Sequence, residues 1–317
     1  MLRTAGALTA ATLLLTSAPS SAAGRPPEEV IRVEDQRVAE TAYRLAVGGV
    51  ARCPAKTHVL GLTLQHLGQF GLADRQAAAT LYNLDRGPGI LVVVPGGPAA
   101  RAGVRAGDVL VAIEGVMVPA EPLLDQAHDQ SRARERADRI SDLLDTAAAD
   151  GTVALTLWRP AGEVTLPVAA VHACPSRVHL ARSKQLNAFA DGTHVLLTTR
   201  LLTLTRDDDE LAFVIAHEMA HNILGHAAKM RAVKQEKRGL AALLARPALT
   251  RRIEREADLL AADLLLDSGY TVDGAAGVLH ALDSGFGGPA VLADHDSIED
   301  RAAALQAHAA GRVPSAR

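Results

Sequence analysis

The spacing of apolar positions changes twice along the chain, and three regions follow from it. Residues 24–56 begin polar and Pro-rich, then place Val38 and Leu45 on one face of a helix, which predicts an N-terminal helical arm. Residues 57–172 hold short β-branched runs between Gly and Pro turns, as strands do. Residues 175–317 return to Ala- and Leu-rich helical periodicity. We therefore expect an α+β protein with a β-rich first domain and a mostly helical second domain.

Within the middle region, residues 58–64 and the apolar run 89–94 are predicted to be strands. The segments 153–158 and 163–168 predict a closing hairpin, because a Pro-Ala-Gly turn separates them. Between these strands, residues 121–149 are charged and predicted to be helical.

The first 23 residues have the pattern of an export signal. Arg3 precedes an apolar stretch, Ala7–Leu15, and Ser21–Ala23 offers a small-residue cleavage site. The alternative is an anchor that stays attached, although the run is short for a bilayer. No later stretch reaches transmembrane length without charges. We expect a soluble mature protein, periplasmic or extracellular, with no transmembrane segment after cleavage.

Composition narrows the classes of partner. Aromatic residues make up only 3% of the chain and the formal net charge is −3, so nucleic acid is not an expected partner. Five cations lie between residues 229 and 238: Lys229, Arg231, Lys234, Lys237 and Arg238. They predict a solvated helix, a mobile lid, or peripheral contact with an acidic membrane or protein surface.

Two cysteines, Cys53 and Cys174, bracket the middle region. An oxidising compartment would allow a disulfide that ties the start of that region to its end. The alternative is a pair of free buried thiols.

The segment His217-Glu218-Met219-Ala220-His221 is an HExxH motif. Positions i and i+4 share one helix face, so the two imidazoles can bind one zinc ion while Glu218 reaches the attacking water. An ordinary solvated helix also produces this pattern by chance. The preceding apolar run 211–216 favours a buried helix and therefore the metal site.

A third ligand is expected on a later helix, where Glu254, Glu256 and Asp258 follow one another. Glu254 and Asp258 are four residues apart and share a face, so Glu254 can bind the metal while Asp258 supports a ligand imidazole. Glu256 is the rival ligand, but it points roughly 200° away around the helix. The remaining alternative is a charged, solvated face.

The run GILVVVPGGPAARAGVRAGDVLVAIEG, residues 89–115, resembles the PDZ domains of bacterial proteases. The resemblance implies a groove that binds an extended peptide by strand addition. Its carboxylate-binding loop would include Arg86, Gly87, Gly89 and Ile90, although Pro88 removes one backbone donor. A regulatory or packing role for this domain is the alternative.

The stretches DDELAFVIAHEMAHNILGH and EREAD resemble the active-site helices of gluzincin peptidases such as HtpX, the membrane CAAX prenyl proteases and their soluble periplasmic relatives. The resemblance implies a zinc endopeptidase with one Zn²⁺ per chain, mostly helical with a small sheet. It implies the ligands His217, His221 and Glu254, with Asp258 as supporting acid. It also implies that residues 187–190 lead into a strand at the substrate edge.

A weaker resemblance concerns His295 and Arg301, which are spaced as in the family's H-P-x-x-x-x-R element, with Asp296 in place of Pro. It implies that His295 approaches the metal and that Arg301 anchors this loop or stabilises negative charge. A surface-loop histidine is the alternative. His226 is expected to pack at a helix end or to support the site from outside, rather than to bind the metal.

The function expected from these motifs is zinc-dependent endoproteolysis of exported or envelope proteins, with the PDZ-like domain engaging substrate or regulating access. Two alternatives stay open. One is a peptide-binding chaperone or adaptor whose peptidase site is latent, and the other is a zinc hydrolase of another kind, such as an amidase. Cleavage preference and oligomeric state are not predicted.

Overall fold

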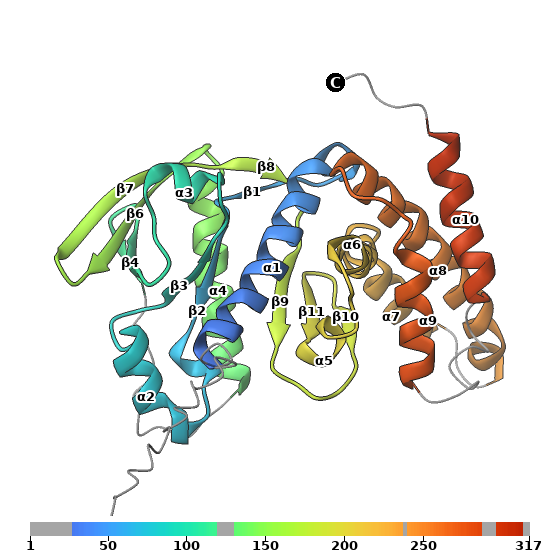
Figure 1. Ribbon diagram of the computed structural model, residues 1–317, viewed down its shortest axis with the longest axis horizontal. Helices are drawn as coiled ribbons and strands as arrows, with labels where there is room; N and C mark the ends of the chain where they lie inside the picture. Colours follow the sequence, from blue (N-terminus) through green and yellow to red (C-terminus); the bar gives the residue numbers. More distant parts are fainter. Residues whose placement is uncertain (1–26, 119–129, 237–239, 287–295, 313–317) are drawn as a thin grey trace, which may run out of the picture.

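The computed structural model describes residues 27–118, 130–236, 240–286 and 296–312, so the expected leader and His295 lie outside the described residues. A β-rich unit and a helical unit lie on opposite sides of the N-terminal helix α1 (Pro27–Gly48) in Figure 1. The coarse prediction of a mixed α+β fold is confirmed.

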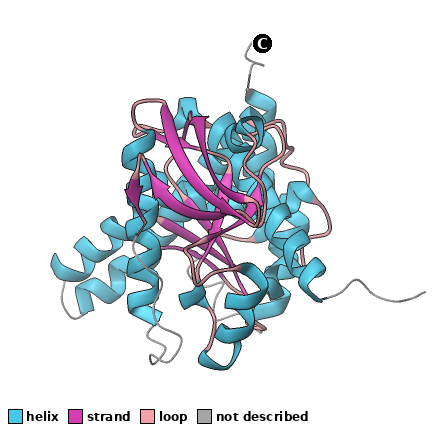
Figure 2. Ribbon diagram, turned by 90° about the vertical axis from the view of Figure 1, so that its left-hand side faces the viewer, coloured by secondary structure: helices cyan, strands magenta, loops and turns pink. Residues whose placement is uncertain are grey.

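The β-rich unit is built on a six-stranded sheet in the order β2-β3-β4-β6-β7, with the short strand β5 paired to β4. Its strands are β2 (Leu62–Gln65), β3 (Gly89–Val93), β4 (Val109–Ile113), β5 (Val116–Met117), β6 (Thr152–Arg159) and β7 (Gly162–Ala169). Its helices are α2 (Leu72–Tyr82), α3 (Pro98–Ala102) and α4 (Gln130–Ala148), with the 3₁₀ turn η2 (Leu67–Gln69). Seen from this end in Figure 2, the twisted sheet lies in front with helices around it.

Two predictions in this unit have clear outcomes. The hairpin is confirmed, since β6 and β7 pair in antiparallel register from Thr152↔Ala169 to Arg159↔Gly162. The single strand predicted at 58–64 is wrong, because Gly61 adopts φ +70° and breaks it in two. The first piece, β1 (Thr57–Val59), leaves the six-stranded sheet and pairs with β8 (Val171–Ala173).

The helical unit contains a three-stranded sheet in the order β10-β11-β9. Its strands are β9 (Arg177–Ala181), β10 (Ala188–Ala190) and β11 (His194–Thr198). Its helices are α5 (Thr199–Leu202), α6 (Asp208–Ile223), α7 (His226–Glu236), α8 (Leu240–Asp267), α9 (Ala275–Phe286) and α10 (Ile298–Gly311).

Helix α6 is the centre of the larger hydrophobic core. Its apolar residues are buried all round rather than along one stripe, including Leu211, Phe213, Ile215 and Met219. It packs against α8, α1, α9 and the small sheet. A helix buried on every side has a fixed position, so its polar side chains are held rigidly.

Helix α1 joins the two units. Its Arg37 Nε donates to Asp208 Oδ1 at 2.7 Å, at the start of α6. Arg182 on the β9 side pairs with Glu34 and Asp35 of α1. Near the helix end, Gly49 lies so close to α8 that a Cβ there would meet Leu264 Cδ2 at 2.3 Å. The N-terminal arm predicted from the sequence is therefore a packed helix of both units.

The β-rich unit also contacts the small sheet through α4, and the contact is ionic. Arg177 of β9 donates to Asp142 at 2.6 Å and to Asp145 at 2.7 Å. His194 Nε2 at the start of β11 lies 3.3 Å from Asp138 Oδ1. These charges fix α4 against the sheet that flanks α6.

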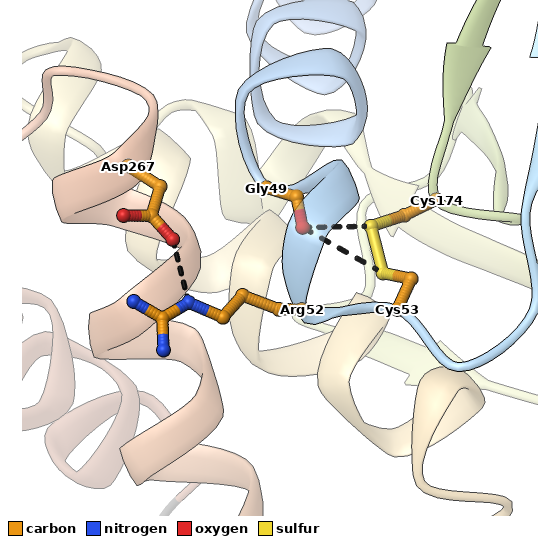
Figure 3. Close-up of a disulfide and its surroundings, with 5 residues drawn as sticks. All are labelled: Gly49, Arg52, Cys53, Cys174 and Asp267. Carbon is orange, nitrogen blue, oxygen red and sulfur yellow. Dashed lines mark hydrogen bonds and ion pairs between the residues drawn. A yellow bond between two sulfur atoms is a disulfide. The ribbon is translucent and has the colours of Figure 1, made fainter. Parts of the chain in front are cut away.

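A disulfide joins Cys53 and Cys174 where the two units meet (Figure 3). The Gly49 carbonyl oxygen lies 3.3 Å from Cys174 Sγ, and the adjacent Arg52 donates from Nε to Asp267 Oδ2 at 2.7 Å. The turn η1 (Val50–Arg52) follows α1. The disulfide links it to the end of strand β8, and Arg52 links it to the end of helix α8.

Replacing both cysteines by serine is expected to lower the free energy of unfolding by about 4 kcal/mol, because the bond closes a loop of 121 residues in the unfolded chain. Urea denaturation measures this change. A reducing agent should destabilise the wild type by a similar amount and leave the double variant unaffected; equal stability of wild type and variant under oxidising conditions would contradict the expectation.

Candidate metal centre

The start of α6 is set by acids, as the sequence predicts. Asp207 is the N-cap, and its Oδ1 accepts from the backbone N–H of Glu210 at 2.9 Å. Asp208, Asp209 and Glu210 follow in the first turn, where negative charge is favoured by the helix dipole. This start places His217, Glu218 and His221 two to four turns into a buried helix.

Three donor atoms converge between α6 and α8. His217 Nε2 and His221 Nε2 are 3.1 Å apart. Glu254 Oε2 lies 3.3 Å from the first and Oε1 lies 3.7 Å from the second. Zinc bonds of about 2.0–2.2 Å in a tetrahedron place neighbouring donors roughly 3.3–3.6 Å apart. Two imidazoles and a carboxylate at these separations therefore fit a zinc ion, and they are the group in the described residues able to hold a metal.

Charge at the site also fits a cation. Burial lowers the pKa of His217, but the contacts with Asp258 and Glu254 outweigh it and raise the pKa to about 10. Burial and the neighbouring His217 lower the pKa of His221 to about 3. The pair thus stabilises one positive charge beside one neutral imidazole, and a metal ion can replace the proton.

Asp258 supports the outer side of His217. Its Oδ1 lies 2.9 Å from His217 Nδ1, the ring nitrogen that faces away from the three converging donors. Arg301 of α10 binds the same carboxylate with both Nε and Nη2, each at 2.8 Å. The position of Arg301 follows from the N-cap Ser297, whose Oγ accepts from Asp300 N and starts α10 one turn earlier. The structure thus places Arg301 on Asp258, where it fixes the imidazole's support.

Glu218 is next to the donors. Its pKa is raised to about 7, chiefly by burial; the charge of His217 lowers this pKa and that of Glu254 raises it. A carboxyl group that exchanges its proton near neutral pH is suited to acid–base catalysis.

His226 supports His221 from outside the three donors, one of the two positions expected for it, whereas its link to Glu256 was not predicted. His226, 2% exposed, approaches His221 with Nδ1 to Nδ1 at 2.9 Å, and Glu256 lies on its far side. Glu256, the rival ligand, therefore contacts His226 rather than the converging donors. Asn222 was also missed: its side chain accepts from Gly192 N at 2.7 Å and donates to His194 O at 3.1 Å, tying α6 to the small sheet. The signal for His226 in the sequence was its position, five residues after His221.

The loop expected to bind a peptide carboxylate uses its amides internally. Ile90 N donates to Asp108 O at 2.7 Å and Arg86 N donates to Asn83 O at 3.2 Å. Gly89 pairs with Val109 and Gln65 in the sheet. Carboxylate capture by Arg86, Gly87, Gly89 and Ile90 stays a prediction that these hydrogen bonds do not favour.

Comparison with known proteins identifies two domain families in the chain. Two imidazoles and a carboxylate that converge from two helices are a donor set typical of metallopeptidases. Residues 159–247 match the profile of peptidase family M48, and residues 89–159 match that of the PDZ domain. The two matches indicate a metalloprotease domain of the M48 type and a PDZ domain in this chain.

Individual relatives add little. No curated protein sequence matches the chain. A solved structure titled "HtrA-type protease AlgW with decapeptide" is 17% identical, with a TM-score of 0.24, over 36% of this chain and 29% of that chain. At this level of similarity, no conclusion about function follows.

Replacing Glu254 by Ala is expected to remove metal from the purified protein, because one of three donors is lost. The metal affinity should fall by more than about 10–100-fold, the decrease typical when a residue that only hydrogen-bonds to a metal ligand is replaced. Elemental analysis after equilibration with zinc measures it. Retention of one equivalent of metal by the variant would contradict the assignment of Glu254.

Replacing Arg301 by Leu is expected to lower the free energy of unfolding by about 3 kcal/mol, because Asp258, with a side chain 5% exposed, loses its bidentate cation. Arg255→Leu is the control. It removes an Arg–Asp pair with Asp296 whose arginine side chain is 64% exposed, and should cost less than about 1 kcal/mol. Equal effects of the two substitutions in urea denaturation would argue against the role given to Arg301.

Proposed function

We propose that this protein is a zinc-dependent endopeptidase that hydrolyses peptide bonds in exported or envelope proteins. The observation that carries the proposal is the convergence of His217, His221 and Glu254 at the edge lengths of a zinc tetrahedron, with Glu218 beside them. The family match supports metal-dependent proteolysis as the reaction class.

In the proposed hydrolysis, the metal ion and the protein side chains have separate roles. Zinc, when bound, supplies a Lewis acid that polarises the scissile carbonyl and activates water. His217, His221 and Glu254 hold it, and Asp258 with Arg301 keeps His217 oriented. Glu218 takes the proton of the attacking water and delivers it to the leaving amine, a role suited to its raised pKa.

The substrate strand is expected along β10. This strand is at the edge of the small sheet and packs against α6. Phe189 in its middle is 41% exposed, and the backbone at a sheet edge can pair with an extended peptide. Pairing along a strand positions an internal peptide bond, which supports endopeptidase rather than exopeptidase action.

Location and regulation have separate support. The Cys53–Cys174 disulfide fits an oxidising compartment, in agreement with the export signal expected at residues 1–23. No described helix is long and apolar enough to cross a membrane. The PDZ domain suggests engagement of peptide or protein substrates. Its α4 contacts the sheet that carries β10, so the domain is placed to influence substrate access.

Replacing Glu218 by Gln is expected to abolish cleavage of casein, with a loss of at least about 100-fold in rate, because the proton acceptor is lost. Zinc content and the urea midpoint should stay close to those of the wild type. A wild type that never cleaves casein but still binds peptides would favour the adaptor function instead. Proteins that co-purify with the Glu218→Gln variant from cells, but not with the wild type, identify the substrates.

A further inference from the structure

The two ligand imidazoles are supported differently on their outer sides. His217 faces a carboxylate directly, since its Nδ1 lies 2.9 Å from Asp258. His221 faces a second imidazole, and only beyond that ring does a carboxylate follow. Metal-binding histidines usually donate their free N–H to a carboxylate, carbonyl or water. The ring of His226, which lies between His221 and Glu256, departs from this usual arrangement.

The chain turn after α6 creates this arrangement. Helix α6 ends at Ile223, and Gly225 takes φ +66°, a conformation that glycine adopts without strain. The chain then reverses into α7, whose first residue is His226. As a result His226 packs against His221 with the two rings edge-on, their centroids 4.9 Å apart.

Glu256 is held at the far side of His226. Its Oε2 lies 3.3 Å from His226 Nε2. Arg252 Nε donates to Oε1 at 2.7 Å, and Lys229 Nζ lies 3.6 Å from Oε2. Two cations thus flank the carboxylate of Glu256, the arrangement expected of an ionised glutamate. An ionised carboxylate only accepts hydrogen bonds.

Donor and acceptor roles then follow along the chain of rings. Glu256 accepts, so His226 carries its proton on Nε2 and leaves Nδ1 as an acceptor. The contact of 2.9 Å between the two Nδ1 atoms requires one donor, so His221 carries its proton on Nδ1. His221 Nε2 is left with its lone pair, and it is this nitrogen that faces His217 and Glu254.

We propose that Glu256 and His226 form a positioning relay that holds His221 in the Nδ1–H tautomer, with Nε2 directed at the metal. The proposal rests on the metal site proposed above. It assigns Glu256, on the face of α8 opposite to Glu254, to the same site through an intermediate ring.

The first test measures the tautomer of His221 by ¹⁵N NMR in the metal-free protein. The wild type should show a single Nδ1–H form. Glu256→Leu, which changes a side chain that is one-third exposed and need not unfold the protein, should give a mixture or the Nε2–H form. The same Nδ1–H tautomer in both proteins would overturn the relay.

The second test is zinc affinity by chelator competition, in a Glu218→Gln background so that self-cleavage plays no part. Glu256→Leu should weaken zinc binding about 10-fold. Asp263→Leu is the control: it removes another carboxylate of α8 that contacts an imidazole, His308 at 3.0 Å, and two arginines, Arg52 and Arg312, as Glu256 contacts Arg252 and Lys229, but away from the ligands. It should leave zinc affinity unchanged.

A double-mutant cycle separates the relay from a general effect of charge. Asn at position 226 keeps an acceptor oxygen near the place of Nδ1 but does not reach Glu256. His226→Asn should therefore retain more zinc affinity than His226→Phe, and Glu256→Leu should have no further effect in the Asn background. If Glu256→Leu weakens zinc binding equally with His or with Asn at position 226, then Glu256 acts only through its charge.

The outcomes distinguish this proposal from the proposed function. If the Glu218→Gln parent binds no zinc, the metal site itself is wrong. If the parent binds zinc and Glu256→Leu and His226→Phe bind it equally well, the site stands and the relay is refuted.

Discussion

Two carboxylates on one face of α8 govern the design of the helical unit. Against α6, Asp258 is buried and Glu254 is partly buried, so each carboxylate is stabilised there by a positive partner. Arg301 from α10 compensates Asp258, and the imidazole site beside Glu254 favours a cation. The packing of three helices is therefore tied to the same charges that prepare the metal site, so stability and metal binding are coupled.

The surrounding structure keeps α6 fixed relative to these charges. Asn222 links it to the small sheet, Arg37 of α1 binds its first turn, and its apolar side chains are buried on all sides. The β-rich unit reaches the same sheet through α4. The contacts of α4 are with Arg177 of β9 and with His194 at the start of β11, the strand that pairs with β10.

Local patterns predicted much of this arrangement. The HExxH spacing and the i, i+4 spacing of Glu254 and Asp258 follow from helix geometry, so the structure brings these residues together as expected, although their roles stay predictions. The hairpin and the start of α6 follow from turn and capping residues. The break at Gly61 was not foreseen, because it accompanies the tertiary pairing of β1 with β8. The contact of Glu256 with His226 needs the reversal at Gly225, which no periodicity reveals.

Helix α1 is the first described element of the chain, yet its partners come late. Arg37 donates to Asp208, which is 171 positions later in the chain, and Arg44 donates to the backbone oxygen of Ser268, which is 224 positions later. Contacts of such long sequence separation are slow to form. A chain emerging from its N-terminus therefore cannot complete this helix's docking until α8 has appeared.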